Sequence, residues 1–442
     1  MPPQASWPIS GKLLFANLDV GGWLIRPHTS RRKKRPALAE PMAQNFRNSS
    51  FFFFSPIVFA RRDEDAFHAR QVDVQEGSLY PWGSIRQRRS SSLPDLMSKI
   101  NNSTLGFEKV FVIGLPSRTD RRDGVLLQAA LSDMEIEFVD GVPGDKVPDK
   151  AIPKTSEHDK LNNGAIGCWR GHMNALGEIV RRNLTSALIL EDDVDWDIRI
   201  RHQLHDFALS TQALIQPLAE APLSYVDPSY PVPTDNTLGR IPDIPFEHLP
   251  ATIPPKVSPY GDDWDLLWIG HCGMHFPFED SKTVPKARII HTNDVTVAPK
   301  KNLWTFNIPF TLKEKYPEHT RAVHHAQEGV CTLGYAVSQK GARKLLQEVA
   351  LKDVSDAVDI LLRFFCEGAK GRKPHNCLTT QPALFHHHRA AGPLNSMSDI
   401  GNHGDGFRDQ SMTDMVRWSV RLNADALLDG RTDFVDQYPD DR

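Results

Sequence analysis

The fold class is decided by the stretch Ser186-Ala187-Leu188-Ile189-Leu190-Glu191-Asp192-Asp193-Val194-Asp195-Trp196-Asp197. It begins as a compact apolar run, a pattern typical of a buried strand. It ends in a burst of carboxylates. Because open α/β sheets bind ligands just beyond the carboxyl ends of their strands, this pattern predicts an α/β protein with a polar site where the strand ends.

The acidic residues allow two interpretations. If the strand stays extended, side chains alternate between faces, so Glu191, Asp193, Asp195 and Asp197 lean one way and Asp192 the other. Neighbouring carboxylates repel one another unless a cation joins them, and a hard divalent ion takes oxygen ligands and bridges to substrate phosphates. The stretch therefore indicates either a metal–diphosphate site or an acidic surface turn, and by itself it does not choose between them.

Composition narrows the class of protein. The 442 residues allow two or three domains, or one large α/β domain with extensions. Lys and Arg total 52 against 55 Asp and Glu, a balance that gives no sign of nucleic-acid binding. The five cysteines are too few and too scattered to predict a disulfide framework or a zinc ribbon. A single Cys366–Cys377 disulfide remains possible, with free buried cysteine as the alternative.

The pattern of apolar and polar residues predicts that the chain is divided into three parts. Residues 1–105 have no sustained helical or strand period and are expected to be a disordered extension. Its basic block, residues 31–35, fits a nuclear-localisation or membrane-surface patch, or a solvated part of the tail. Residues 106–430 are expected to form the folded domain and 431–442 a short tail. Within the domain, the proline-rich insertion 217–260 is expected to be an ordered excursion or a mobile loop beside the site.

No run of the chain approaches the roughly 18 apolar residues needed to span a bilayer. The sequence as it stands therefore predicts a soluble protein. An anchor in a segment that is absent from this sequence stays open, and membrane association with it.

A strand–helix–strand unit opens the folded part. Apolar residues predict a strand at 110–113, a helix from 121 to about 134 and a strand at 135–139, so a parallel strand pair is expected. The unit lacks both the dinucleotide fingerprint and the phosphate loop of nucleotide triphosphatases. Its first turn offers Arg118, Asp120 and Arg121 instead. Arginine forks suit phosphate and carboxylate recognition, although a capped helix start with solvated arginines fits equally.

The later elements carry the other candidate residues. A helix over 164–182 carries His172, and strands are expected at 264–270 and 332–338. The helix that follows residue 355 carries Asp359 in its first turns, and Asp359 with Arg363 would also make an ordinary i,i+4 ion pair. Three adjacent histidines at 386–388 cannot all point at one metal from a strand, so they predict at most one metal ligand.

Five segments together resemble glycosyltransferase family 25, and within it fungal members related to bacterial lipooligosaccharide galactosyltransferases. These segments are 112–122, 167–172, 187–193, 334–342 and 385–400, in a chain region from about 107 to 430. The resemblance implies a nucleotide-diphospho-sugar transferase fold, with a central mostly parallel sheet flanked by helices. It also implies inverting sugar transfer, commonly of galactose from UDP-galactose, with a divalent ion.

The chain departs from the family pattern at two positions near the expected donor site. It has Gly114 where the family usually has Asn, and Gly171 where the family usually has Ser. These departures motivate an alternative function, a catalytically weak nucleotide-sugar-binding protein of the same fold. A nuclear or scaffold protein that depends on the basic block is a more distant alternative.

The resemblance and the residue pattern together give a hypothetical site. Mn²⁺ or Mg²⁺ would lie between the donor diphosphate and the acidic triplet, acting as a Lewis acid. Inverting transfer also needs a carboxylate that takes the acceptor proton, for which Asp359 is preferred over Asp356 and Asp265. The expected metal ligands are Glu191, Asp193 and His388, with His387 as an alternative to His388. The expected nucleotide-sugar contacts are Arg118, Asp120, Arg121, His172 and Asp192.

The expected partners are a UDP-sugar donor and a glycan or glycoprotein acceptor, with no nucleic acid. The expected location is the secretory pathway, in the Golgi lumen, with the cytoplasm as the alternative. Besides the resemblance, the glycosylation sequon at Asn183 motivates the lumenal location.

Overall fold

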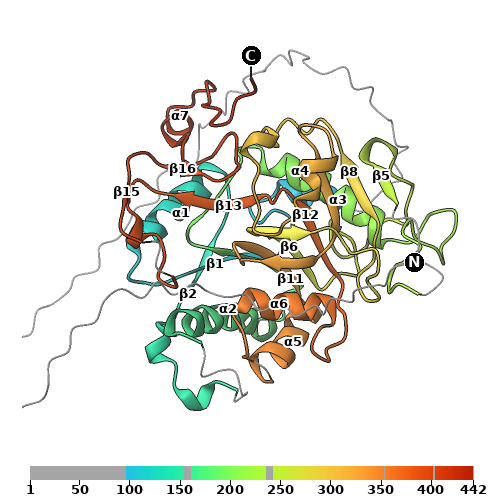
Figure 1. The fold of residues 1–442 in the computed structure, drawn as a ribbon, viewed down its shortest axis with the longest axis horizontal. Coiled ribbons are helices and arrows are strands. Elements are labelled where there is room, and N and C mark those ends of the chain that lie inside the picture. The colour runs from blue at the N-terminus through green and yellow to red at the C-terminus, as the bar shows by residue number, and fades with distance from the viewer. Residues whose placement is uncertain (1–95, 154–160, 235–241, 353, 402–403, 442) are drawn as a thin grey trace, which may run out of the picture. The chain divides into compact units, whose positions relative to one another are not determined.

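The computed structural model describes residues 96–153, 161–234, 242–352, 354–401 and 404–441 (Figure 1). Its centre is a nine-stranded sheet. The strands, in their order across this sheet, are β2 (Glu137–Asp140), β1 (Lys109–Gly114), β3 (Ser186–Glu191), β11 (Gly334–Ser338), β6 (Leu266–Gly270), β12 (Cys377–Gln381), β9 (Arg321–His325), β8 (Arg288–His291) and β5 (Asp243–Pro245).

Most strands of the sheet run in one direction. β1 is parallel to β2 and β3, β6 is parallel to β12, and β8 is parallel to β5. β11 is antiparallel to both β3 and β6, and β9 is antiparallel to both β12 and β8. Only β11 and β9 therefore oppose the other strands, and the predicted mostly parallel sheet is confirmed. The carboxyl ends of β1, β3, β6 and β12 meet at one edge.

Alternating side chains give the sheet two apolar faces. On β1, Phe111 and Ile113 pack with the helix α2 (Asn163–Arg181), while Val110 and Val112 join a second cluster on the other face. Figure 1 shows α2 together with α5 (Gln339–Leu345) and α6 (Val358–Glu367) on the first face. The second cluster includes residues of α1 (Thr119–Leu131) and α3 (Ile200–Ile215). This two-sided burial explains why the strands are apolar runs instead of alternating patterns.

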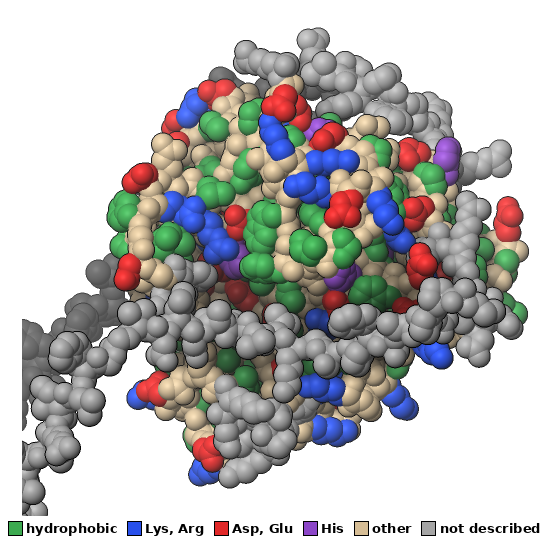
Figure 2. All heavy atoms as spheres, in the orientation of Figure 1, with side chains coloured by type: hydrophobic (Ala, Val, Ile, Leu, Met, Phe, Trp, Pro, Cys, Tyr) green, Lys and Arg blue, Asp and Glu red, His purple; other side chains and the backbone are tan. Residues whose placement is uncertain are grey.

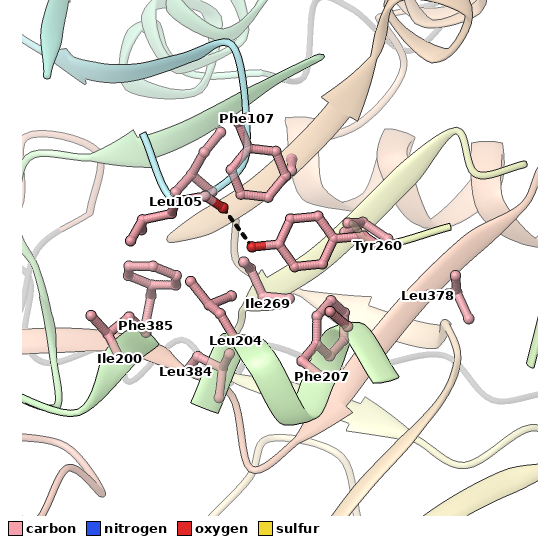
Figure 3. Close-up of a cluster of buried hydrophobic side chains, with 14 of the residues drawn as sticks. Leu105, Phe107, Ile200, Leu204, Phe207, Tyr260, Ile269, Leu378, Leu384 and Phe385 are labelled. Atoms are coloured by element: carbon pink, nitrogen blue, oxygen red, sulfur yellow. Dashed lines mark hydrogen bonds between the residues drawn. The ribbon is translucent and has the colours of Figure 1, made fainter. Parts of the chain in front are cut away.

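The described chain is packed from its first residues, ahead of the boundary predicted at 106. A 3₁₀ helix, η1 (Leu96–Asn101), precedes the fully buried Leu105. Tyr260 donates a hydrogen bond of 2.6 Å to the Leu105 carbonyl, and its ring stacks on Phe107 (Figure 3). The prediction for residues 1–95 lies outside the described residues.

The C-terminal segment is also packed. Arg417 donates to the carboxylates of Asp436 and Asp440, and the amide of Gln437 donates to two backbone carbonyls. The chain after 430 therefore continues along the domain surface and differs in this respect from a separate tail.

The structure contains two disulfides, one more than the single bond that the sequence left possible. Cys366–Cys377, the pair named from the sequence, joins α6 to β12, and Cys272–Cys331 joins the loop after β6 to the loop before β11. The second pair is 59 residues apart in the chain, and it meets because β6 and β11 are neighbours in the sheet. Cys168 is free.

The surface carries charges of both signs. Figure 2 shows Lys, Arg, Asp and Glu side chains interspersed over the face in view. Within the described ranges, no helix has both the length and the apolar character needed to cross a bilayer.

Candidate active site

The acidic stretch turns where the sequence was expected to stay extended. β3 ends at Glu191, Asp192 and Asp193 form a turn, and a new strand, β4 (Val194–Trp196), follows. β4 leaves the central sheet and pairs with β13 (Phe385–Arg389). The alternation through the carboxylates depended on the strand staying extended, and the turn ends that strand at Glu191.

The last two carboxylates of the stretch are separated from the first three. Asp195 is fully buried and accepts hydrogen bonds from Gln128 at 2.7 Å and from Thr413 at 2.6 Å. Asp197 is paired with Arg199 at 2.9 Å. The candidate site therefore contains only the triplet 191–193, at the carboxyl edge of the sheet.

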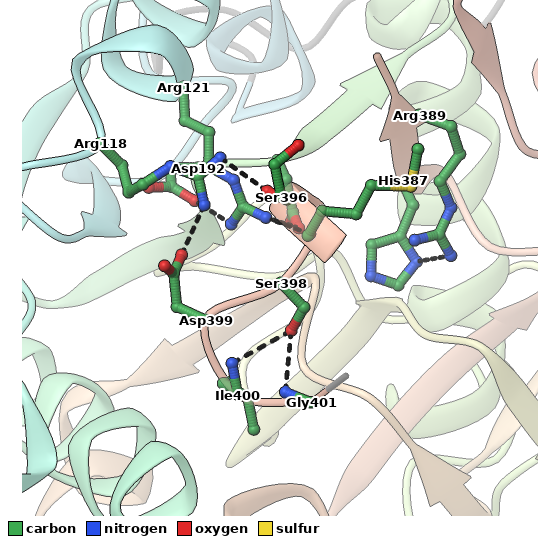
Figure 4. Close-up of polar contacts among 12 residues, drawn as sticks. Arg118, Arg121, Asp192, His387, Arg389, Ser396, Ser398, Asp399, Ile400 and Gly401 are labelled. Atoms are coloured by element: carbon green, nitrogen blue, oxygen red, sulfur yellow. Dashed lines mark hydrogen bonds and ion pairs between the residues drawn. The ribbon is translucent and has the colours of Figure 1, made fainter. Parts of the chain in front are cut away.

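Arg121 joins the two carboxylates of the turn. Its Nη1 is 2.9 Å from Asp192 Oδ1, and its Nη2 is 3.2 Å from Asp193 Oδ2 and also donates to the carbonyl of Met397. Arg118, one turn earlier, pairs with Asp120 and with Asp399 (Figure 4). The two predicted arginines thus connect the acidic turn to the C-terminal segment 394–401.

The two carboxylates of the turn differ in their electrostatics. Burial raises the pKa of Asp192 to about 6, with a further contribution from Asp193, while Arg121 opposes the rise. Burial also raises the pKa of Asp193, but the charges of His387, Arg121 and Arg389 outweigh it and hold that pKa below its ordinary value. Both carboxylates are therefore mainly ionised at neutral pH, and as the pH falls Asp192 takes up a proton first. Its Oδ1 is buried and has no hydrogen-bond partner in the described structure.

His172 lies behind Glu191. Its Nδ1 is 2.8 Å from the Tyr335 hydroxyl, and its Nε2 is 3.3 Å from the Thr332 hydroxyl. Thr332 donates to Glu191 Oε1 at 2.6 Å, and the imidazole itself is 3.5 Å from that oxygen. His172 is 1% exposed, so the structure places it as a support of Glu191 and not on the open surface of the site.

Of the three adjacent histidines, His387 has the strongest electrostatic effect on Asp193. Its Nδ1 is 3.1 Å from Arg389 Nη2 (Figure 4). His388 points elsewhere, with Nδ1 3.2 Å from Thr413 Oγ1. Strand alternation explains the difference, since neighbours on β13 face opposite sides.

Two arginines that the sequence did not single out complete the surroundings of the turn. The charge of Arg389 helps to lower the pKa of Asp193. Arg421 donates a hydrogen bond of 3.1 Å to the Asp192 carbonyl and one of 2.8 Å to the side-chain oxygen of Gln128. Burial lowers the pKa of Arg421, although the carboxylates nearby oppose this. No local pattern marks Arg421, whereas Arg389 directly follows the histidine run.

The arrangement of the acidic and histidine side chains shows what kind of divalent-ion site the turn could form. Within the described ranges, no group of three or more His, Cys, Asp or Glu side chains is arranged to hold a metal. Mg²⁺-type ions need fewer protein ligands, because one or two carboxylates plus substrate phosphates suffice. The Glu191 carboxylate and the unpartnered Asp193 Oδ1 fit such a shared site, and they do not fit a cage built from protein alone.

Asp359 lies at the start of α6 and touches the loop before β11. Its Oδ2 accepts a hydrogen bond of 2.8 Å from the Cys331 backbone nitrogen. The predicted i,i+4 pair with Arg363 is wrong, because Arg363 instead contacts Glu328 and Glu367. Those residues lie on β10 (Gln327–Val330) and on α6, one turn after Arg363.

The charges of three carboxylates act on one thiol. Burial raises the pKa of Cys168 well above its ordinary value, and the charges of Glu191, Asp359 and Asp193 raise it further. The two lesser candidates for the base are tied elsewhere. Asp265 pairs with Lys344 at 2.8 Å and Asp356 with Lys370 at 3.0 Å.

A mostly parallel α/β sheet with carboxylates and arginines at its carboxyl edge defines the class of nucleotide-sugar transferase-like folds. Residues 107–223 match the family model described as Glycosyltransferase family 25 (LPS biosynthesis protein). This match agrees with the resemblance to glycosyltransferase family 25 seen in the sequence.

Curated relatives agree with this placement. Procollagen galactosyltransferase 1 of Danio rerio is 25% identical over 259 residues, which cover 56% of this chain and 30% of the relative. Procollagen galactosyltransferase 1-B of Xenopus laevis is 31% identical over 273 residues, which cover 59% of this chain and 31% of the relative. Inactive glycosyltransferase 25 family member 3 of Homo sapiens is 35% identical over 117 residues, which cover 23% of this chain and 19% of the relative. The chain spans less than a third of the length of each.

Proposed function

We propose that this chain transfers a sugar, galactose in the first instance, from a UDP-sugar to a hydroxyl group of a glycan or protein-linked acceptor, with inversion at the transferred carbon. The observation that carries the proposal is the buried, unpartnered Oδ1 of Asp193 beside the carboxylate of Glu191 at the carboxyl edge of the sheet. A buried carboxylate oxygen without a partner is costly unless a ligand completes it. The names of the galactosyltransferase relatives support the choice of donor.

In this proposal Glu191 and Asp193 hold Mn²⁺ or Mg²⁺ together with the donor diphosphate. The ion would supply Lewis-acid stabilisation of the leaving nucleotide diphosphate. Arg121 fixes the acidic turn, and His172 fixes Glu191 through Thr332. We place His387, in preference to His388, beside the ion because its charge acts strongly on Asp193 while His388 contacts Thr413.

Arg118 and Asp192 are also predicted to contact the donor or to support its site. Arg118 pairs with two partly exposed carboxylates, Asp120 and Asp399. A phosphate can replace the latter contact, since a guanidinium binds either anion with the same fork of donors. Asp192 would act indirectly, by holding Arg121 in place.

Asp359 is proposed as the base that takes the proton from the acceptor hydroxyl. Its Oδ2 accepts from the backbone nitrogen of Cys331, which precedes Thr332, the donor to Glu191, and this supports its placement near Glu191. Asp265 and Asp356 are less suited, because each is held by a lysine.

A second candidate function is a nucleotide-sugar-binding protein with weak or no turnover. The relative named as an inactive family member favours it, and so does the pairing of both turn carboxylates with Arg121. In that case the donor would bind without transfer.

We propose the secretory lumen as the compartment, with the cytoplasm as the alternative. Two disulfides support an oxidising environment. The sequon residue Asn183 is exposed, which glycosylation requires.

The test is a donor screen with the purified chain, in which UDP release is followed with and without Mn²⁺. Asp193→Asn is the test variant and Asp433→Asn, an exposed carboxylate paired only with Arg431, is the matched control. We expect ion-dependent UDP release that Asp193→Asn abolishes and the control retains. Binding of UDP-sugar without release would favour the second function, and full turnover in excess chelator would remove the metal from the proposal.

A further inference from the structure

Three consecutive hydrogen bonds, which we call the Tyr335 relay, connect the interior of the sheet to the first carboxylate of the acidic triplet. The relay consists of Tyr335 on β11, His172 on α2, Thr332 in the loop before β11 and Glu191 at the end of β3. None of its first three residues is more than 4% exposed, so bulk water does not compete for these hydrogen bonds.

The direction of each hydrogen bond follows from the carboxylate end of the relay. The Thr332 hydroxyl has one proton, and it donates that proton to Glu191 Oε1 at 2.6 Å, because a carboxylate only accepts. Thr332 Oγ1 therefore accepts from His172 Nε2, which is 3.3 Å away, and this nitrogen carries a proton. The same Nε2 is 3.5 Å from Glu191 Oε1, so its proton also points toward the carboxylate.

The tyrosine end of the relay decides the state of the other ring nitrogen. Tyr335 Oη is 2.8 Å from His172 Nδ1, which is the only hydrogen-bond partner of this hydroxyl among the described residues. Burial raises the pKa of Tyr335 well above its ordinary value, so the hydroxyl keeps its proton. A proton on Nδ1 as well would leave the buried hydroxyl proton without an acceptor, which is unfavourable. Tyr335 therefore donates, and His172 has the tautomer with its proton on Nε2.

The opposite tautomer would weaken the hold on Glu191. With its proton on Nδ1, the ring would accept at Nε2 and compete with Glu191 for the single proton of Thr332. The Tyr335 hydroxyl opposes this by donating to Nδ1. Within the described part of the chain no hydrogen bond reaches the second oxygen of Glu191, Oε2. The relay thus holds one oxygen of this carboxylate and leaves the other for a ligand.

We infer that Tyr335 is a positioning residue for Glu191, and that it acts by fixing the tautomer of His172. The Thr332 proton then stays on Glu191 Oε1, and Oε2 is presented to the divalent ion. The inference rests on the proposed function, because Glu191 needs a fixed orientation only where it holds a ligand. Supporting groups of this kind orient the residues that bind a metal and raise its affinity.

The test compares two buried tyrosines that each lose one hydroxyl. Tyr335→Phe removes the donor to His172 Nδ1. Tyr260→Phe is the matched control, because Tyr260 is equally buried, belongs to the apolar cluster on the other face of the sheet and donates 2.6 Å to the Leu105 carbonyl.

Two measurements on the full chain separate the relay from general stability. Nitrogen-15 NMR of labelled histidine rings reports the tautomer of His172, whose signals are identified by their absence in His172→Asn. Water-proton relaxation measures the binding of Mn²⁺ with UDP present.

We expect a single His172 tautomer, with the proton on Nε2, in the unmodified chain and in Tyr260→Phe. In Tyr335→Phe the form with its proton on Nδ1 should appear beside it, and Mn²⁺ should bind about tenfold more weakly, the lower end of the usual effect of losing such a support. Both variants should lose thermal stability to a similar extent, because each loses one buried hydrogen bond.

Thr332 provides a second pair of variants, which stays informative even where Tyr335→Phe does not fold. Thr332→Val removes the hydroxyl and should weaken Mn²⁺ binding roughly 10–100-fold, whereas Thr332→Ser keeps the hydroxyl and should bind Mn²⁺ nearly as the unmodified chain does. Equal losses in these two variants would show that the hydroxyl is not the contact that matters.

A His172 ring with its proton on Nδ1 in the unmodified chain would overturn the inference. An unchanged tautomer or an unchanged Mn²⁺ affinity in Tyr335→Phe would overturn it as well. An unmodified chain that binds no Mn²⁺ would contradict the proposed function instead, and the tautomer of His172 in Tyr335→Phe would then decide the relay by itself.

Discussion

The carboxylate of Asp192 fills the space in which a side chain at Gly114 would begin. A Cβ built on Gly114 would lie 2.2 Å from Asp192 Oδ2 and 2.8 Å from its carboxyl carbon. The absence of a side chain at 114 therefore lets Asp192 lie back against β1 and pair with Arg121. The family's usual Asn at this position would require a different orientation of Asp192. The second departure is milder, since a Cβ on Gly171 would meet Ile113 at 3.0 Å.

Gly114→Ala should destabilise the protein by about 1–3 kcal/mol, the usual cost of overpacking, because the new methyl group forces Asp192 away from Arg121. Urea unfolding measures this change. Gly177→Ala is the control, because a Cβ there meets nothing within 4 Å in the middle of α2 and alanine favours a helix. In a double-mutant cycle, Asp192→Ala should relieve most of the Gly114→Ala loss; purely additive losses would contradict the contact.

At pH 8 the Asp192→Asn variant should be more stable than the unmodified chain. This gain in stability should shrink as the pH is lowered. The folded pKa of Asp192, about 6, is above its ordinary value of 3.8, so the folded state holds this proton more tightly and loses stability as pH rises from 3.8 through 6. Each pKa unit corresponds to about 1.36 kcal/mol, and the gain should disappear near pH 4. Unfolding at pH 4, 6 and 8 tests this, with the exposed Asp123→Asn as the control. A pH-independent gain would refute the explanation.

Asp359→Asn should lower turnover strongly and leave UDP binding near normal. The amide keeps an oxygen that accepts from the Cys331 nitrogen, while a lost general base costs roughly 10²–10⁴-fold. Single-turnover transfer and UDP calorimetry separate the two effects. Asp356→Asn, which loses only a partly exposed pair with Lys370, is the control. Equal small losses in both variants would make Asp359 a support of the loop and not a base.

The two disulfides should differ in what they support. Replacing Cys272 and Cys331 by Ser should reduce UDP-sugar turnover, because the bond holds the loop that carries Thr332, the donor to Glu191. Replacing Cys366 and Cys377 should mainly lower the free energy of unfolding, since that bond joins α6 to β12. Thermal unfolding and turnover of both double variants check this. The opposite assignment of effects would show that the loop does not position Glu191.

Buried neutral histidines should make the protein sensitive to acid. Burial lowers the pKa of His271 and His325 to about 4, and of His324, His386 and His388 to about 3. Their folded pKa values lie below the ordinary 6.5, so the unfolded chain binds more protons and stability should fall progressively as pH decreases from about 6.5 toward 3.

Urea unfolding between pH 7 and 4.5 measures this slope. His324→Asn should reduce it, because the amide can replace the donor to the His325 carbonyl without titrating. His248→Asn changes an exposed imidazole and should leave the slope as it is. A slope that His324→Asn does not change would exclude this imidazole as a cause.

Local patterns predicted the framework of the fold well. The strand–helix–strand unit at the start, the helix that carries His172 and the apolar run of β3 are each recognisable within about 20 residues, because backbone periodicity and burial are local properties. The same local information missed the turn at Asp192. An acidic run does not show whether a strand continues, since the turn depends on β4 pairing with β13, almost 200 residues later.

The sequence by itself determined the α/β class, the resemblance to glycosyltransferase family 25, and the chemical character of the acidic triplet with Arg118 and Arg121. Only the tertiary structure decided that the charge of His387 acts on Asp193, that Arg421 donates to the Asp192 carbonyl, and that Cys272 pairs with Cys331. The physical reason is distance along the chain. These relationships join segments that are adjacent only because β3, β11, β6 and β12 are neighbours in one sheet, and that neighbourhood depends on the free energy of the packed whole and not on any local preference.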